Sequence, residues 1–227
     1  MNGSYFSNLH VMENPNANIK EGFYSKLFAR FYDPFMESME QKVLGGYRKQ
    51  LLEPLSGDIL EIGSGTGVNF KLYPQGCHVL ASEPSEHMLK YAQERLKMEP
   101  VSADIEIVLA GVGSDELEKK VPEGGFDAIV CTLVLCTIPE PEKAVQSFKH
   151  WLKPNGKLII LEHVHAKTNP RKMVHNVLNP AWKYFAEGCH LNRNTAQMLR
   201  DSGFEAEWEH DFTKVMPFHV SVMSLKG

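Results

Sequence analysis

Short apolar runs alternate with helical patterns through the middle of the chain. The first run, residues 58–62, leads directly into a glycine-rich turn at residues 63–67. Four more strand-like runs follow, at residues 78–83, 105–109, 126–134 and 157–164. The last two are almost continuously apolar, as strands buried on both faces require. Strands that alternate with helices predict an open, mostly parallel α/β sheet with helices on both faces. Such a sheet binds its ligands at the carboxyl ends of the strands.

The two ends of the chain follow other patterns. Residues 1–20 are polar and turn-prone, which predicts a flexible start. Between Phe23 and Met39, aromatic and apolar residues recur at helical spacing, which predicts an amphipathic helical cover. After the fifth strand, helical patterns precede two strand-like runs, at residues 170–186, 194–202, 206–212 and 217–225. The two runs predict an antiparallel strand pair at one edge of the sheet.

We therefore predict a single domain over residues 21–227, behind the flexible segment 1–20. Its parts are an N-terminal helical cover, a ligand-binding core, a helical insertion on the ligand side and a C-terminal strand pair, at residues 21–56, 57–164, 165–203 and 204–227. The length of 227 residues agrees with one large domain.

Charge and cysteine usage exclude several classes of function. Lys and Arg number 24 against 28 Asp and Glu, a net charge of −4, which gives no general attraction to nucleic acid. No apolar run reaches the roughly 20 residues of a membrane-spanning helix, and the start does not resemble a secretory signal. The cysteines form no CxxC pair, so their spacing predicts neither a disulfide framework nor a zinc knuckle. We expect a cytoplasmic protein with free thiols and no integral membrane segment.

The spacing of the glycines narrows the choice of ligand. Gly63, Gly65 and Gly67 follow the first strand, but Val68 stands where a dinucleotide fingerprint needs its third glycine. NAD is therefore the weaker prediction. The loop has no Gly-Lys-Ser/Thr ending, which excludes a phosphate-binding P-loop. Glu61 precedes the loop and would repel a pyrophosphate, yet it would attract a ligand that carries an ammonium and a sulfonium.

A second acidic residue, Glu83, ends the second strand. A carboxylate at this place accepts both hydrogen bonds of a ribose diol. Adenosine joined to a cation is therefore the predicted ligand. The alternative is that Glu83 only supports the helix that starts at Ser85, through the helix dipole.

The loop and three further segments resemble the class I methyltransferases that use S-adenosylmethionine. The matching segments are Leu60-Glu61-Ile62-Gly63-Ser64-Gly65-Thr66-Gly67, Ser82-Glu83-Pro84-Ser85, Phe126-Asp127-Ala128-Ile129-Val130-Cys131 and Leu152-Lys153-Pro154-Asn155-Gly156. Others resemble the methyltransferase-like 7 group, the animal thiol S-methyltransferases: Val130-Cys131-Thr132-Leu133-Val134-Leu135-Cys136, Leu161-Glu162-His163-Val164, Asn179-Pro180-Ala181-Trp182 and Gly188-Cys189-His190-Leu191. Animal members of that group begin with a hydrophobic membrane anchor, whereas this chain begins with a polar segment. Peripheral contact with a membrane stays open.

The resemblance implies a Rossmann-like sheet, S-adenosylmethionine as cofactor, and in-line transfer of a methyl group to a small molecule. It implies that the glycine loop approaches the methionine part, that Glu61 faces the ammonium, that Glu83 holds the ribose and that Gly113 lies near the adenine. The predicted cofactor site consists of Glu61, Gly63, Ser64, Gly65, Gly67, Asn69, Glu83, Pro84, Met88, Gly113, Thr132 and Leu133.

The methyl acceptor is expected where the fourth strand ends. The candidate catalytic residues are Cys136, His163 and His190. No strong base marks this region, and a thiol with a pKa near 8.5 is already partly ionised at neutral pH, so S-methylation of a thiol is favoured. Each candidate also has a structural alternative: Cys136 as a buried hydrophobe, His163 bonded to a loop carbonyl, and His190 as a helix cap.

Other functions stay open on the sequence alone. UbiE-type enzymes, which methylate quinone precursors, share the Leu-Val-Leu pattern after the fourth strand but commonly carry histidine where Cys136 stands. Carbon or oxygen acceptors would gain from a base, for which His163, His165 and His190 are available. Less favoured are a nicotinamide oxidoreductase and a non-catalytic module that binds S-adenosylmethionine. The ten histidines show no metal-ligand spacing, so no metal site is predicted, and the oligomeric state stays open.

Overall fold

The computed structural model describes residues 43–166, 168–185, 188–214 and 216–226. The segment predicted as flexible over residues 1–20 and the helical pattern between Phe23 and Met39 lie outside these residues. The predicted core and the two C-terminal strands lie within them.

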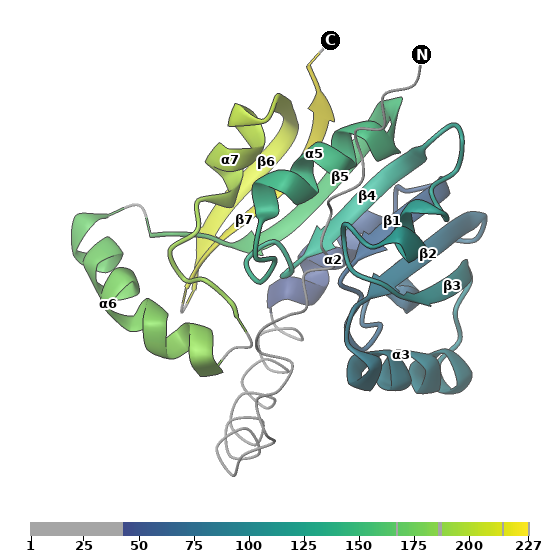
Figure 1. Cartoon of the computed structure of the whole chain (residues 1–227), viewed down its shortest axis with the longest axis horizontal. Coiled ribbons are helices and arrows are strands. Elements are labelled where there is room, and N and C mark those ends of the chain that lie inside the picture. The colour runs from purple at the N-terminus through teal and green to yellow at the C-terminus, as the bar shows by residue number, and fades with distance from the viewer. Residues whose placement is uncertain (1–42, 167, 186–187, 215, 227) are drawn as a thin grey trace, which may run out of the picture.

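The described residues form one seven-stranded sheet in the order β3-β2-β1-β4-β5-β7-β6 (Figure 1). Strands β1 to β5 pair in parallel, while β7 runs antiparallel to both β5 and β6. The strands are β1 Gly57–Ile62, β2 Cys77–Glu83, β3 Asp104–Leu109, β4 Phe126–Thr132, β5 Leu152–His163, β6 Phe204–Thr213 and β7 Pro217–Leu225. The predicted fold class, a mostly parallel Rossmann-like sheet with an antiparallel C-terminal pair, is confirmed.

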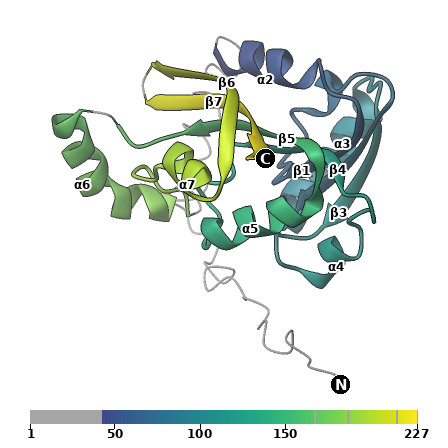
Figure 2. The same ribbon diagram turned by 90° about the horizontal axis from the view of Figure 1, so that it is seen from above.

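Helices cover both faces of the sheet (Figure 2), with α2 and α3 on one face and α4, α5 and α7 on the other. The helices are α2 Gly45–Leu52, the 3-10 helix η2 Phe70–Leu72, α3 Glu86–Met98, α4 Asp115–Glu118, α5 Pro141–Trp151, α6 Asn169–Phe185 and α7 Thr195–Asp201. In both views α6 stands apart from the sheet. Within the part of the chain that the structure describes, no helix is long and apolar enough to cross a membrane.

Two buried apolar clusters lie on opposite faces of the sheet. In β1, Leu60 and Ile62 point into the cluster beneath α5 and α7, and Ile59 points into the cluster beneath α2. The same alternation runs along β5, where Ile160 and Leu161 belong to opposite clusters. Because both faces are covered, the central strands are apolar at almost every position.

Two local features depart from a simple alternation of strands and helices. Turns and the short η2 follow the glycine loop in place of a longer helix, since Pro74 cannot continue a helix and disfavours the helical conformation in the residue before it. Residues 153–156 follow the end of α5 and form a bulge within β5. The pairing of β4 with β5 passes from Phe126–Leu152 to Ala128–Lys157 across it. At Gly156 a Cβ atom would lie 2.9 Å from the carbonyl oxygen of Phe126, so the bulge requires a glycine there.

Candidate active site

The glycine loop joins β1 to the rest of the site in a conformation that needs glycine. Gly63, Gly65 and Gly67 have φ angles of 64°, 56° and 76°, a region that other residues rarely adopt. A Cβ atom on Gly63 would lie 2.3 Å from Cγ2 of Val134, so the loop packs closely against the segment after β4. Among the described residues, no atom would lie within 4 Å of a Cβ atom on Gly65. The backbone at Gly65 therefore faces open space that a ligand can fill.

Glu83 fastens this loop to the end of β2. Its Oε2 accepts a hydrogen bond of 2.9 Å from Gly65 N, and its Oε1 accepts one of 2.9 Å from Ser85 N. The second bond joins the carboxylate to the start of α3, and the first places it at the loop. Of the two predicted residues that follow, Pro84 is exposed and Met88 is half-buried in the first turn of α3. Their contact with a cofactor stays a prediction.

Glu61 is the centre of a buried hydrogen-bond network. Asn69 Nδ2 donates to Oε1 at 2.7 Å, and the Tyr73 hydroxyl donates to Oε2 at 3.0 Å. Arg48 Nη1 donates to Asn69 Oδ1 at 2.9 Å and to Thr132 Oγ1 at 2.7 Å. Burial raises the pKa of Glu61 to about 7, although these hydrogen bonds and the charge of Arg48 oppose the rise. Glu61, Asn69 and Thr132, all predicted, thus meet beneath the loop.

A third buried carboxyl group, Glu162, holds the segment that follows β4. Its Oε1 accepts hydrogen bonds of 2.7 Å from Val134 N and 2.7 Å from Leu135 N. The preceding residue, Leu133, has a φ of 59°, which costs of order 1–3 kcal/mol for a residue with a side chain. Burial raises the pKa of Glu162 to about 7. The carboxyl group therefore fixes a strained turn at the carboxyl edge of the sheet, where Leu133 was predicted to lie near the cofactor.

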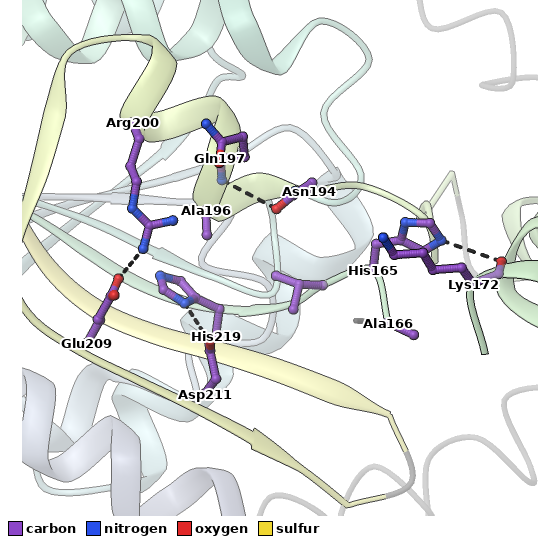
Figure 3. A pocket seen from close by; sticks show the side chains of 11 residues that line it. His165, Ala166, Lys172, Asn194, Ala196, Gln197, Arg200, Glu209, Asp211 and His219 are labelled. Atoms are coloured by element: carbon purple, nitrogen blue, oxygen red, sulfur yellow. Dashed lines mark hydrogen bonds and ion pairs between the residues drawn. The ribbon is translucent and has the colours of Figure 1, made fainter. Parts of the chain in front are cut away.

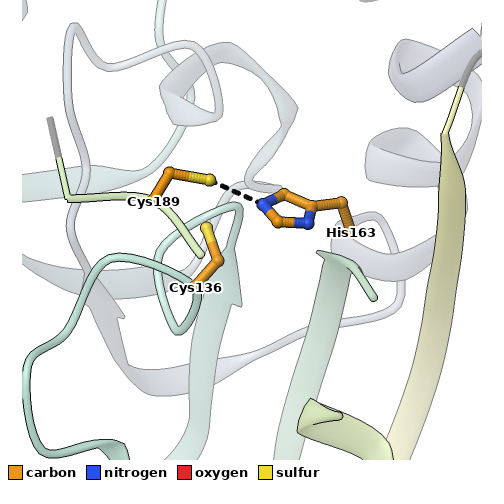
Figure 4. Close-up of side chains that lie close together, drawn as sticks. All are labelled: Cys136, His163 and Cys189. Carbon is orange, nitrogen blue, oxygen red and sulfur yellow. Dashed lines mark hydrogen bonds between the residues drawn. The ribbon is translucent and has the colours of Figure 1, made fainter. Parts of the chain in front are cut away.

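Two cysteines and a histidine meet at the same edge (Figure 4). Cys136 lies after β4, His163 ends β5 and Cys189 lies between α6 and α7; all three are buried. His163 Nε2 lies 2.7 Å from Cys189 Sγ, and Trp182 Nε1 donates to the same sulfur at 3.3 Å. A hydrogen bond between the two thiols lowers the pKa of Cys189 and raises that of Cys136. Burial alone would lower the pKa of His163, but the bond to Cys189 and its charge raise it.

His190, the third candidate catalytic residue, is half-buried beside this cluster. Its backbone N donates to the Cys136 carbonyl oxygen at 3.0 Å, which joins the loop after β4 to the loop before α7. Burial lowers the pKa of its imidazole, so the ring is neutral at pH 7. Gly113, predicted near the adenine, has a φ of 87° and lies exposed after β3. No contact of Gly113 tests that role.

A polar cavity of about 340 Å³ is lined in part by the connection between β5 and α6 (Figure 3). Its walls come from α7, β6, β7, the β5–α6 connection and the start of α6, and a hydrogen bond of 2.6 Å between His219 and Asp211 lies within them. His165, one of the histidines considered as a base, lines this cavity and lies 3.5 Å from the Lys172 carbonyl oxygen. None of the predicted cofactor residues lines it. The cavity is therefore separate from the glycine loop.

The chemistry at the glycine loop fits S-adenosylmethionine. Ser64 Oγ and Ser82 Oγ are buried beside the loop and have no hydrogen-bond partner within the described residues. These hydroxyls and the open face of Gly65 suit the polar atoms of a ligand. Glu61 and Glu83 bring two carboxyl groups to the ends of adjacent strands, which suits a ligand with an ammonium and a sulfonium.

Four residues of this site carried no predicted role. Tyr73 bonds to Glu61, and Arg48 bonds to Asn69 and Thr132; both contacts arise from tertiary packing, and neither residue belongs to a motif. Glu162 and Cys189 stand in the segments Leu161-Glu162-His163-Val164 and Gly188-Cys189-His190-Leu191, so the family resemblance held a signal for both.

Known proteins match both the core and the flanking parts of the chain. A family model described as "Methyltransferase domain" matches residues 60–160. Thiol S-methyltransferase TMT1B of Rattus norvegicus is 32% identical over 203 residues, which cover 87% of this chain and 81% of that protein. The ubiquinone/menaquinone biosynthesis C-methyltransferase UbiE of Escherichia fergusonii is 28% identical over 170 residues, 65% of this chain and 66% of that protein.

The fold is shared with solved methyltransferase structures. A SAM dependent methyltransferase from Aquifex aeolicus has a TM-score of 0.60 at 19% identity, covering 90% of this chain and 100% of that one. The sequence identity to TMT1B, 32% over most of both chains, identifies the family. It argues against a nicotinamide oxidoreductase and against a non-catalytic binding module. S-adenosylmethionine is accordingly the cofactor. The protein belongs to the family of TMT1B, among the class I S-adenosylmethionine-dependent methyltransferases, and methylates a small molecule.

Proposed function

We propose that the protein methylates the sulfur atom of a small thiol. The observation that carries this proposal is the extent of the similarity to TMT1B, a thiol S-methyltransferase. The 203 aligned residues exceed the span of the methyltransferase domain, residues 60–160. The alignment therefore includes parts of the chain outside the cofactor-binding core, where the shape of an acceptor site is decided.

On the cofactor side, we propose that residues 57–164 hold S-adenosylmethionine at the carboxyl ends of β1, β2 and β4. The backbone of the glycine loop contacts the methionine part, and Glu61 with Asn69 and Thr132 presents a polar floor below it. Glu83 accepts hydrogen bonds from the ribose. When bound, the cofactor supplies a methyl group on a sulfonium, which departs readily. The task of the protein is then to hold the acceptor in line with that methyl group and to exclude water.

On the acceptor side, we propose that residues 165–203 and the segment after β4 enclose the thiol. Cys136 and His190 lie in these parts and His163 ends the neighbouring strand β5, while the backbone bond from His190 to Cys136 holds the two loops together. A thiol with a pKa near 8.5 needs little help to ionise at neutral pH. The site can therefore act on a thiol without a dedicated strong base.

A second candidate function is methylation of carbon or oxygen on a quinone precursor. The similarity to UbiE favours it. His190 also favours it, because a half-buried imidazole that is neutral at pH 7 can accept the proton that such an acceptor must lose.

A transfer assay with labelled methyl groups separates the two. Purified protein is given labelled S-adenosylmethionine and, in parallel, small thiols, quinols, phenols and amines. We expect labelled thioethers from the thiols. Transfer to quinols or phenols with none to thiols would refute the thiol proposal. The matched variant His190→Gln keeps a polar side chain and removes the base, so we expect it to retain thiol methylation but lose transfer to oxygen or carbon.

A further inference from the structure

We infer that Cys136, His163 and Cys189 form a binding site for a thiophilic divalent cation, with Zn²⁺ as the best fit. The three side chains come from three segments of the chain and converge at the carboxyl edge of the sheet (Figure 4). Their two sulfur atoms and one ring nitrogen all lie within 4.8 Å of one another. All three residues are buried, with exposed fractions of 2%, 5% and 7% in chain order.

The distances allow an ion to enter with small movements. Zinc binds sulfur at about 2.3 Å and nitrogen at about 2.0–2.1 Å in a tetrahedron, which sets neighbouring ligand atoms roughly 3.5–3.8 Å apart. The pair His163 Nε2 and Cys189 Sγ, 2.7 Å apart, must open by about 1 Å to reach this geometry. Three protein ligands leave the fourth corner of the tetrahedron free, as is typical of catalytic zinc sites.

The ligand types select the metal. Thiolate and imidazole favour zinc and other thiophilic ions, whereas calcium and magnesium require oxygen ligands. Two thiolates and one neutral imidazole around a divalent cation carry no net charge. A neutral assembly can be buried at this depth without the desolvation cost of an isolated charge.

Hydrogen bonds of neighbouring atoms hold the loops that carry Cys136 and Cys189 in place. His190 N donates to the Cys136 carbonyl oxygen at 3.0 Å, and Arg193 Nη1 donates to the Ile138 carbonyl oxygen at 2.8 Å in the same loop. The Cys189 loop is tied to α6, since Leu191 N donates to Asn179 Oδ1 at 2.8 Å. Trp182 donates to the Cys189 sulfur from outside the cluster, and such a hydrogen bond to a metal ligand holds the ligand in its orientation.

The position of the site suggests what the free corner binds. It lies beside the turn that follows β4, where we place the acceptor, so the sulfur of a thiol acceptor can complete the coordination. In that step the S–H bond breaks, a bond forms between sulfur and metal, and the proton leaves with the water or hydroxide that the sulfur displaces. This role of the metal rests on the proposed thiol acceptor; the metal site itself does not.

Spacing in the sequence predicted no metal site, because motif rules rest on ligands that lie close together in the chain. Here the fold assembles the ligands from segments that are far apart: His163 and Cys189, for example, are 26 positions apart.

Metal content and cobalt spectroscopy test the site in the full chain. Protein purified under reducing conditions is analysed for metal, then stripped, loaded with Co²⁺ and examined for sulfur-to-cobalt charge-transfer absorption. We expect about one metal per chain and the charge-transfer band. We expect Cys136→Ser and Cys189→Ser to weaken metal binding at least tenfold, since even loss of a group that only hydrogen-bonds to a ligand weakens it roughly 10- to 100-fold.

Two other buried cysteines provide matched controls. Cys77 and Cys131 lie outside the cluster, so Cys77→Ser and Cys131→Ser should leave metal content and the cobalt spectrum unchanged while showing the damage that the same substitution does to folding. Unchanged metal affinity in the Cys136 and Cys189 variants would overturn the site. A disulfide between Cys136 and Cys189 in the reduced preparation, seen by mass spectrometry, would overturn it too.

Addition of a thiol separates this proposal from the proposed function. A shift of the cobalt charge-transfer band on adding thiol supports coordination of the acceptor, and its absence overturns that role. Protein that binds cobalt through both cysteines but methylates no thiol would support the metal site and refute the thiol acceptor. Protein that methylates thiols at full rate after the metal is removed would refute the role of the metal alone.

Discussion

Between about pH 7.3 and about pH 5.5, we expect the protein to lose most of its affinity for S-adenosylmethionine, because Glu61 takes up a proton in this range. Burial raises the pKa of Glu61 to about 7 in the cofactor-free protein. An ammonium group beside the carboxyl group favours its ionised form. Binding below pH 7 must therefore remove a proton, so affinity rises with pH up to about 7, before the α-amino group of the cofactor loses its own proton.

The size of the effect follows from the two pKa values. We take the ammonium to return the pKa of Glu61 from about 7 to its usual 4.5. At about pH 5.5 almost all of the cofactor-free protein then carries the proton on Glu61. The free energy of removing this proton weakens binding about 30-fold, or about 2 kcal/mol, relative to protein in which Glu61 is already ionised. The α-amino group of the cofactor has an ordinary pKa of about 7.7–8.0, so the ligand keeps its charge across this range.

Titration calorimetry at several pH values measures the effect. Glu61→Gln should bind more weakly near neutral pH and show a flat pH profile. Glu162→Gln is the matched control, because its carboxyl group also has a pKa raised to about 7 but bonds to backbone N–H groups of the loop after β4. It should keep the slope of the native protein. Affinity that does not change with pH, or a slope that persists in Glu61→Gln, would refute the assignment of Glu61.

Three further results are expected. Glu83→Ala should weaken cofactor binding by about 1.5–3 kcal/mol for each charge-assisted hydrogen bond lost, and calorimetry that finds unchanged affinity would contradict the ribose role. Gly63→Ala should lower the Tm by at least about 2–8 °C, because alanine in the left-handed backbone conformation costs about 1–2 kcal/mol and its Cβ would clash with Val134. An unchanged Tm would mean that the loop can shift to make room. Cofactor-free protein should lose stability to urea as pH rises from about 4.5 to about 7, since Glu61 and Glu162 hold protons more tightly folded than unfolded. The loss should be smaller in Glu162→Gln, and stability that instead increases over this range would show that neither carboxyl group has a raised pKa.

The sequence predicted the sheet and the loop well, because both depend on local pattern. Apolar runs mark strands that are buried on both faces, and glycine is required wherever the loop turns back with positive φ. The network around Glu61 could not be predicted in full. Tyr73, from the turn after η2, bonds to the carboxyl group, and Arg48, from α2, bonds to Asn69 and Thr132; both contacts depend on tertiary packing. Neither position belongs to a spacing rule.

The acceptor side was predicted less completely, for a related reason. Cys136, His163 and His190 were chosen one by one, each with a structural alternative. For His163 the partner is a side chain, Cys189, rather than a loop carbonyl. That pairing depends on how the loop between α6 and α7 folds back over the sheet, and no local pattern encodes this.

The pairing of β5 with β7 has a consequence for the C-terminus of the chain. Adjacent residues of a strand point to opposite faces, so Glu162 holds the turn after β4 on one face while His163 meets Cys189 on the other. A slip of β5 by one residue would exchange the two. The pairs Glu162–His219 and His163–Phe218 oppose such a slip. In a truncated chain that ends before β6, nothing would fix the register of β5, so Glu162 and His163 would no longer be held on their proper faces. The unpaired edge of β5 would also promote aggregation. Strands β6 and β7 thus matter to the active site although they contribute no predicted site residue.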